Sequence, residues 1–190
     1  MNRKHVVTAV AALLIAPFGL AAQQTVVAGQ LRSGTLSFDG KATLGDFTGT
    51  TQTVTGAMAG GPDLASVQGW VEAPVKTLKT GNGRRDRDLV KTMDADSFPN
   101  LRFELGSVTT GTGVGDSSTV TLHGKLVIHG VTREVALPGN VVIQTGAVRV
   151  RTDFPLDLHD YGINRLSRML GLLKMQPDIL VHVDVTFAQQ

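Results

Sequence analysis

The 190-residue chain contains no cysteine. A disulfide framework is therefore excluded, and so is an N-terminal lipid anchor attached through a thiol. The folded chain must be stabilised by its hydrophobic core alone. Hydrophobic residues make up 42% of the sequence and charged residues 18%, a composition typical of a globular domain.

An excess of charge of either sign is also missing. The chain carries 18 Lys and Arg against 16 Asp and Glu. Two of the basic residues, Arg3 and Lys4, lie in a segment that we expect to be removed, which would leave 16 of each sign. Because nucleic-acid-binding domains are ordinarily basic, this balance argues against nucleic acid as a partner.

No hydrophobic run is long enough for a membrane-spanning helix. The run at residues 6–20 is shorter than the roughly 20 apolar residues that a bilayer requires, and it contains Pro17 and Gly19. A basic pair precedes it and two alanines follow it, so we predict a secretory signal peptide over residues 1–22 rather than a membrane anchor. Residues 23–190 suit one domain, which we expect in the periplasm or outside the cell with no integral membrane span.

Motifs that carry catalysis are missing as well. The chain has neither a Gly-x-Ser-x-Gly nucleophile turn nor a His-x-x-x-His pair. His123 and His129 share a strand face, but extended chain separates them by ~20 Å, too far to bind one metal ion. We interpret His159-Asp160-Tyr161 as a hydrogen-bond network in a loop, with a hydrolase as the alternative. We therefore predict a protein that is not an enzyme, without catalytic or metal-binding residues.

Alternation of apolar and polar residues is the dominant pattern, and it predicts strands with one face toward an apolar interior. The clearest case lies near the C-terminus, where one face carries Ile179, Val181, Val183, Val185 and Phe187. Residues 101–105, 120–128 and 148–156 repeat the pattern. With 22 glycines and turn signals between such segments, we count roughly eight strands. Since an exposed apolar edge would invite aggregation, we predict an all-β fold, an eight-stranded antiparallel barrel.

Two segments break this alternation and predict one or two short covering helices. In residues 85–94, apolar residues at helical spacing follow a run of alternating charges. In residues 164–173, one apolar stripe has the spacing i, i+3, i+4 and i+7 and consists of Leu166, Met169, Leu170 and Leu173. Such a stripe most often packs on the core. The alternative is a lid at the barrel mouth, in which Met169 would adapt to an apolar ligand.

Two motifs carry a resemblance to a known family. The first contains Thr80, then Arg85-Asp86 with a following Leu89, then Phe98-Pro99 before a strand. The second is Gly-x-Leu-x-Ile-x-Gly-Val-Thr-x-x-Val-x-Leu over residues 124–137. Together they resemble the YceI-like family of lipocalin-like, polyisoprenoid-binding proteins. Family members commonly have Asp-x-x-His-Ser before the first strand, where this chain has no His, so no role of that His is carried over.

The resemblance implies a lipocalin-like barrel that binds a polyisoprenoid or an isoprenoid quinone, without another cofactor, and it permits a homodimer. Eight-stranded barrels are either filled by their own side chains or hold one small ligand. Small residues at inward positions favour an open lumen; they are Gly56, Gly69, Ala73 and Gly124. The predicted ligand contacts are Phe38, Phe47, Met58, Trp70, Phe98, Phe103, Leu126, Ile128, Phe154, Leu156, Met169 and Leu170. Strict alternation puts Trp70 outside, but an indole can lie at a barrel rim near the ligand entrance.

These features predict an exported binding protein that carries or sequesters a polyisoprenoid or related lipid in an apolar lumen. The alternative is a structural or stress-protective envelope domain with a filled core, which acts through its surface. The charged segment at Arg85 and Asp86 also has two interpretations. It orients the head group of a ligand, or it caps a helix and ties that helix to a neighbouring loop; we favour the second.

Overall fold

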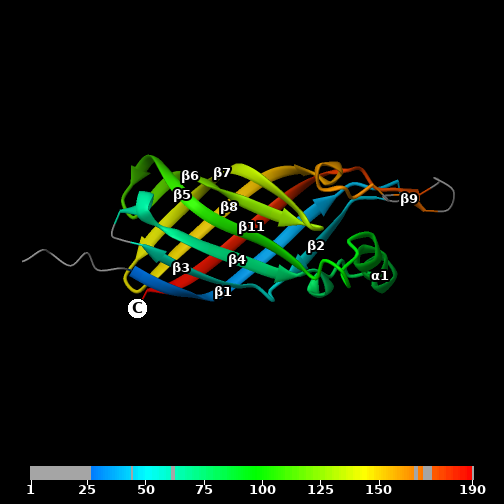
Figure 1. The fold of residues 1–190 in the computed structure, drawn as a ribbon, viewed down its shortest axis with the longest axis horizontal. Helices are drawn as coiled ribbons and strands as arrows, with labels where there is room; N and C mark the ends of the chain where they lie inside the picture. Colours follow the sequence, from blue (N-terminus) through cyan, green and yellow to red (C-terminus); the bar gives the residue numbers. More distant parts are fainter. Residues whose placement is uncertain (1–26, 44, 61–62, 165–166, 169–172, 190) are drawn as a thin grey trace, which may run out of the picture.

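The computed structural model describes residues 27–43, 45–60, 63–164, 167–168 and 173–189. Most of them form antiparallel strands that wrap into a barrel, with the helix α1 (Gly83–Thr92) at one end (Figure 1). The long strands are β1 (Val27–Gly40), β5 (Asn100–Val114), β6 (Ser117–Ile128), β7 (Val131–Gln144), β8 (Ala147–Asp157) and β11 (Asp178–Gln189). The shorter ones in the barrel are β2 (Phe47–Thr51), β3 (Thr55–Gly60) and β4 (Gln68–Pro74).

These strands occupy eight positions around a closed circle. Neighbours follow the order β11-β8-β7-β6-β5-β4-β3-β1, and β1 pairs with β11 to close the barrel. Strand β3 pairs with residues 27–30 of β1 and strand β2 with residues 36–40, so the two short strands share one position. The pairings are antiparallel throughout the barrel. The prediction of an eight-stranded antiparallel barrel is confirmed.

The inward faces follow the alternation in the sequence. In β6 the buried side chains are Val120, Leu122, Leu126 and Ile128. In β11 they are Val181, Val185 and Phe187. By contrast, Lys125 on β6 is exposed, and Leu180 on the outer face of β11 is 41% exposed. Because closure gives every strand two neighbours, these apolar faces line one interior. The buried residues pack there in two clusters: Val185 and Phe187 belong to one, and Val181 and the four residues of β6 belong to the other.

Helix α1 confirms the predicted helix over residues 85–94, although it begins at Gly83. It starts there because the Asn82 side chain accepts hydrogen bonds from the backbone N–H groups of Arg84 and Arg85, as an N-cap residue does. Leu89 and Met93 then pack against the barrel core. The helix therefore covers one end of the barrel.

The helix expected in residues 164–173 is wrong for the residues that the structure describes there. Strands β9 (Ser167–Arg168) and β10 (Leu173–Lys174) pair with each other in antiparallel register. The other members of the apolar stripe, Leu166, Met169 and Leu170, lie outside the described residues. A stripe of four apolar residues is a weak signal, because short helices are marginal unless tertiary packing stabilises them.

Candidate ligand-binding lumen

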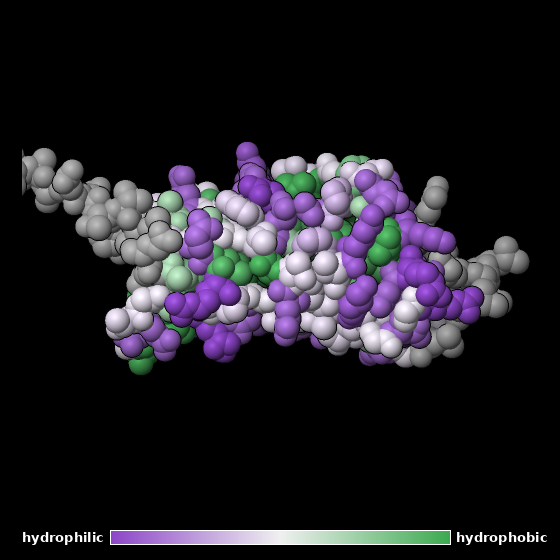
Figure 2. All heavy atoms as spheres, turned by 90° about the horizontal axis from the view of Figure 1, so that it is seen from below, coloured by the Kyte–Doolittle hydropathy of each residue, from purple (hydrophilic) through white to green (hydrophobic). Residues whose placement is uncertain are grey.

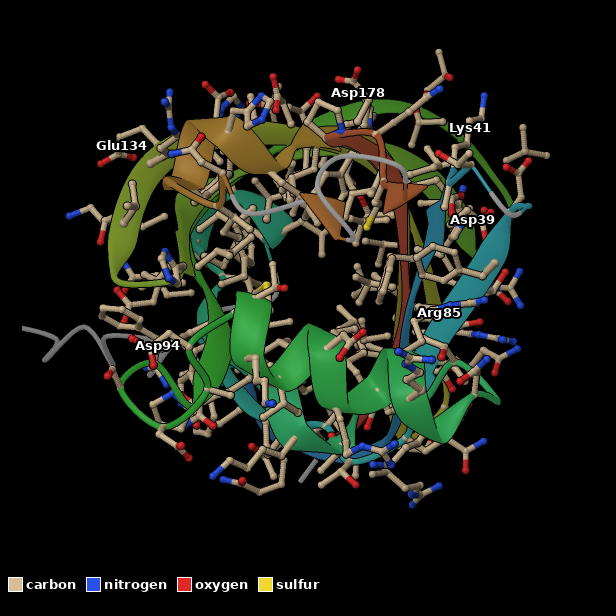
Figure 3. All side chains as sticks on the ribbon, turned by 90° about the vertical axis from the view of Figure 1, so that its right-hand side faces the viewer. Asp39, Lys41, Arg85, Asp94, Glu134 and Asp178 are labelled. Atoms are coloured by element: carbon tan, nitrogen blue, oxygen red, sulfur yellow. The ribbon has the colours of Figure 1, made fainter. Side chains whose placement is uncertain are left out.

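A cavity of about 970 Å³ runs along the barrel interior. At one end it is bordered by Arg85 of α1 and reaches the exposed residues Asn82 and Arg84. At the other end it reaches Leu64, in the short 3-10 helix Leu64–Ser66, and Ile143 at the end of β7. Figure 3 looks into the barrel from the α1 end and shows the helix lying across it, with side chains around an open centre. The cavity therefore opens to solvent beside α1.

The wall of the cavity consists mainly of hydrocarbon side chains. Strands β8 and β11 contribute Val148, Val150, Phe154, Leu156, Ile179, Val181, Val183, Val185 and Phe187. Thr152 also faces the cavity, but its hydroxyl donates a 2.6 Å hydrogen bond to the carbonyl of Pro138. Among the described residues, no buried side-chain nitrogen or oxygen lacks a hydrogen-bond partner. An apolar ligand would therefore leave no buried polar side chain of the described wall unsatisfied.

The outer surface has the opposite character. The face in Figure 2 is covered mainly by hydrophilic and neutral residues, with hydrophobic residues between them. On the outward side of β8 and β11, Arg149 and Arg151 both form ion pairs with Asp184, at 2.5 and 3.0 Å. The barrel is thus polar outside and apolar inside, so its hydrophobic surface is directed at the lumen.

Most of the predicted contact residues border the cavity: Phe38, Phe47, Met58, Trp70, Phe103, Leu126, Ile128, Phe154 and Leu156. Met169 and Leu170 lie outside the described residues, and Phe98 does not border the cavity in this structure. Several smaller lining residues, among them Val150 and Val183, were missed. The alternation of apolar and polar residues puts both side chains on inward faces. This alternation is therefore the sequence signal that identifies them as lining residues, although their side chains are small.

Phe98 packs against the turn that joins β6 to β7. Ile128 pairs with Val131, so His129 and Gly130 form a two-residue turn, and both have positive φ angles, 51° and 75°. The rings of Phe98 and His129 meet edge to face with centroids 4.8 Å apart. A Cβ atom on Gly130 would collide with the Phe98 ring. This contact brings together the two sequence motifs that carry the family resemblance.

Trp70 lies on the outer face of β4. The guanidinium of Arg102 is 4.6 Å from the centre of its indole. Arg102 in turn forms ion pairs with Glu104 at 2.8 Å and with Glu72 at 3.3 Å. Trp70 borders the cavity along its strand, yet its indole belongs to this outward charged row on β4 and β5.

At the mouth, Asp86 and Arg85 have different roles. The Asp86 carboxylate accepts hydrogen bonds from the hydroxyl of Thr80 at 2.7 Å and from its backbone N–H at 2.9 Å. The hydrogen bond from the Thr80 hydroxyl is the main reason that the pKa of Asp86 lies below its usual value. Asp86 thus ties α1 to the preceding loop, while Asn82 caps the helix. Arg85 instead borders the cavity, with its guanidinium 4.1 Å from the ring centre of Phe47.

The segment His159-Asp160-Tyr161 has structural partners. The backbone N–H of His159 donates to Asp157 at 2.8 Å, and Asp160 forms a 2.9 Å ion pair with Arg133. Tyr161 is buried, and this burial raises the pKa of its hydroxyl. Among the described residues, no group of three or more His, Asp or Glu is placed to hold a metal ion.

An eight-stranded antiparallel barrel around an apolar cavity that opens beside a short helix is the architecture of lipocalin-like proteins. The chain belongs to the family defined by the YceI-like domain, whose model matches residues 23–187. The resemblance seen in the sequence is confirmed. No curated protein matches the chain.

Three solved structures illustrate the similarity. A polyisoprenoid-binding domain from Saccharophagus degradans, implicated in plant cell wall breakdown, has a TM-score of 0.72 at 14% identity, covering 86% of this chain and 99% of that chain. BcnA from Burkholderia cenocepacia has a TM-score of 0.67 at 13% identity, covering 80% and 95%. The YceI protein of Campylobacter jejuni has a TM-score of 0.59 at 16% identity, covering 75% and 84%. At these identities the similarity is evidence for the fold alone.

The described part of the chain contains no helix with the length and apolar character needed to cross a bilayer.

Proposed function

We propose that the barrel binds a long-chain isoprenoid or a related amphiphilic lipid in its lumen without a covalent bond, and that it carries or sequesters this lipid. The observation that supports the proposal most directly is the apolar cavity of about 970 Å³. This volume is near the upper end of the roughly 300–1,000 Å³ of small-molecule sites. A core filled by its own side chains, the alternative from the sequence, does not agree with such a cavity.

The energetics of burial favour a hydrocarbon ligand. Each methylene group removed from water contributes about 0.8 kcal/mol, so a chain of about ten carbons would contribute about 8 kcal/mol before the costs of ordering. Inside the barrel, the cavity wall offers this ligand many apolar contacts, and the buried polar side chains that the structure describes already have hydrogen-bond partners. The solved relative from S. degradans is described as a polyisoprenoid-binding domain, and we extend that ligand class to this chain.

We also propose that the protein is exported and acts as a binding protein rather than an enzyme. Export rests on the signal peptide predicted for residues 1–22, which lie outside the described residues. A binding role agrees with the lining of the lumen. Thr152 faces the lumen deep inside the barrel, and its hydroxyl is already used in a hydrogen bond to the carbonyl of Pro138. A homodimer stays a prediction.

Native mass spectrometry of the protein purified from its own envelope extract tests the proposal. We expect a bound isoprenoid or lipid at near-unit stoichiometry, which organic extraction would then identify. A protein that is empty, and that also fails to bind added isoprenoid quinones, fatty amides or fatty acids, would contradict the proposal.

A variant that fills the lumen shows whether the ligand lies there. Val183 is half-buried, borders the cavity and pairs with Leu36 and Thr152 in the middle of the barrel wall. In Val183→Trp the added ring would project into the cavity, so we expect loss of lipid binding without loss of the fold. Ala136→Trp, on the exposed outer face of β7, is the matched control and should bind normally. Normal binding by Val183→Trp would place the ligand elsewhere.

A further inference from the structure

Arg85 lies at the rim of the lumen, and none of its side-chain hydrogen-bond donors has a partner among the described residues. Its guanidinium is stacked on Phe47, and both residues border the cavity. The side chain is half-buried, and within the described part of the chain it has neither a hydrogen-bond nor an ion-pair partner. Figure 3 shows Arg85 at the open end of the barrel, where α1 approaches β2. Since a guanidinium carries five N–H donors, this rim has a free donor group beside an apolar cavity.

Asp86 interacts electrostatically with Arg85 but forms no ion pair with it. The Asp86 carboxylate is directed at Thr80, with which it forms two hydrogen bonds. Asp88, also on the rim, has its own interaction within the protein. Arg84 adds a second, exposed positive charge that borders the cavity. The rim near the start of α1 therefore carries two arginines, of which Arg85 is the more buried.

The backbone N–H groups of Arg84 and Arg85, at the start of α1, are not available to bind a ligand at this rim. The N–H groups of Arg84 and Arg85 already donate to the Asn82 side chain, at 3.0 and 3.2 Å. Any group bound here would be held by side chains. Phe47 fixes the plane of the Arg85 guanidinium and is itself packed edge to face against Phe38, with ring centroids 6.0 Å apart.

We propose that Arg85 binds an anionic head group, a phosphate or a carboxylate, of an amphiphile whose chain occupies the lumen. This inference rests on the proposed function and narrows its ligand class. A planar guanidinium stacked on an aromatic ring keeps its N–H edges free for two oxygens of one anion. Hydrogen bonds between charged groups are roughly twice as strong as those between neutral groups. Arg85 therefore favours an anionic amphiphile over an alcohol or a quinone of equal chain length.

The test measures the affinity of the delipidated full-length mature protein for pairs of lipids that differ only in the head group. Geranylgeranyl phosphate is compared with geranylgeraniol, and oleate with oleyl alcohol. We expect the anionic member of at least one pair to bind about tenfold more tightly or better, as charge-assisted hydrogen bonds allow. The pair that shows the preference tells whether a phosphate or a carboxylate is bound.

Variants of Arg85 test whether this side chain causes the preference for the anionic lipid. Arg85→Gln should weaken only the anionic lipid, by about tenfold, and leave the alcohol unchanged. Arg85→Lys keeps the charge and should retain part of the preference. Arg87→Gln makes the same change of charge at an exposed position of α1 that does not border the cavity, and it should change neither affinity.

Several results would overturn the proposal. Equal affinities for both members of both pairs would do so, and so would an equal loss of both affinities in Arg85→Gln, which would indicate that Arg85 acts by supporting Phe47. Competition by inorganic phosphate at the concentration of the lipid would show an anion site independent of the lumen. If no lipid binds at all, the proposed function fails and this proposal fails with it.

Discussion

The ring of Phe103 on β5 lies over Gly124 on β6, in the space that a side chain at Gly124 would need. A Cβ atom on Gly124 would be 2.8 Å from Cζ of Phe103 and would also collide with the carbonyl oxygen of Glu104. The backbone cannot move away cheaply, because Gly124 is buried within the paired strands. We expect Gly124→Ala to lower the free energy of unfolding by about 1–3 kcal/mol, as overpacking does, measured by urea denaturation.

Gly106→Ala is the matched control for this prediction. Gly106 is exposed on β5, and the nearest atom to a Cβ there, the carbonyl oxygen of His123, would be 3.6 Å away. We expect a change within about 0.5 kcal/mol, as for most surface substitutions. Equal losses in the two variants would show that the contact between Gly124 and Phe103 is not the cause.

The strands were predictable because a period of two is a local property of the sequence. Val181, Val183 and Val185 fall on one face whatever their neighbours are, so the inward wall of β11 follows from the sequence directly. The position of Phe98 depended on a turn at Gly130, which comes from a distant part of the chain. The contact of Arg85 with Phe47 likewise joins α1 to a strand far from it in sequence. Pairings of this kind have no local signature, and they define the mouth of the lumen.

Trp70 is the single tryptophan of the chain, so its fluorescence reports one place on the barrel. Because its indole stacks with Arg102 on the outer face, we expect saturation of the lumen with lipid to leave the emission spectrum nearly unchanged. Arg102→Ala should shift the spectrum, since it removes a cation–π contact worth about 0.5–1 kcal/mol at an exposed site. A large blue shift of the wild-type spectrum on addition of lipid would contradict the outer location.

The N-cap of α1 connects helix stability to the rim of the lumen. Asn82→Ala removes the oxygen that accepts from two backbone N–H groups, so we expect a loss of about 1 kcal/mol in the free energy of unfolding. Asn82→Asp keeps an acceptor and should be close to the wild type in the same urea titration. A loss of equal size in Asn82→Asp would indicate that the amide N–H₂ group, and not the cap, is what matters.

His182 joins three strands on the outer face of the barrel closure. Its Nδ1 is 2.5 Å from a carboxylate oxygen of Asp153 on β8, and its Nε2 is 3.2 Å from a carboxylate oxygen of Asp39 on β1. The hydrogen bond with Asp153 is the main cause that raises the pKa of His182 above its ordinary value of 6.5. The pKa of Asp39 is lowered, chiefly by the hydrogen bond from Thr48 and then by His182.

The raised pKa of His182 and the lowered pKa of Asp39 determine how the contribution of His182 to stability depends on pH. A group whose pKa is higher in the folded than in the unfolded state stabilises the fold fully below its unfolded value, and the contribution is lost as the pH rises through the folded value. We therefore expect the melting temperature of His182→Asn to lie further below that of the wild type near pH 6 than near pH 9. Toward strongly acidic pH the gap should narrow again, as Asp39 becomes protonated. A gap that stays constant from acidic to basic pH would show that His182 stabilises the closure by packing and not by its charge.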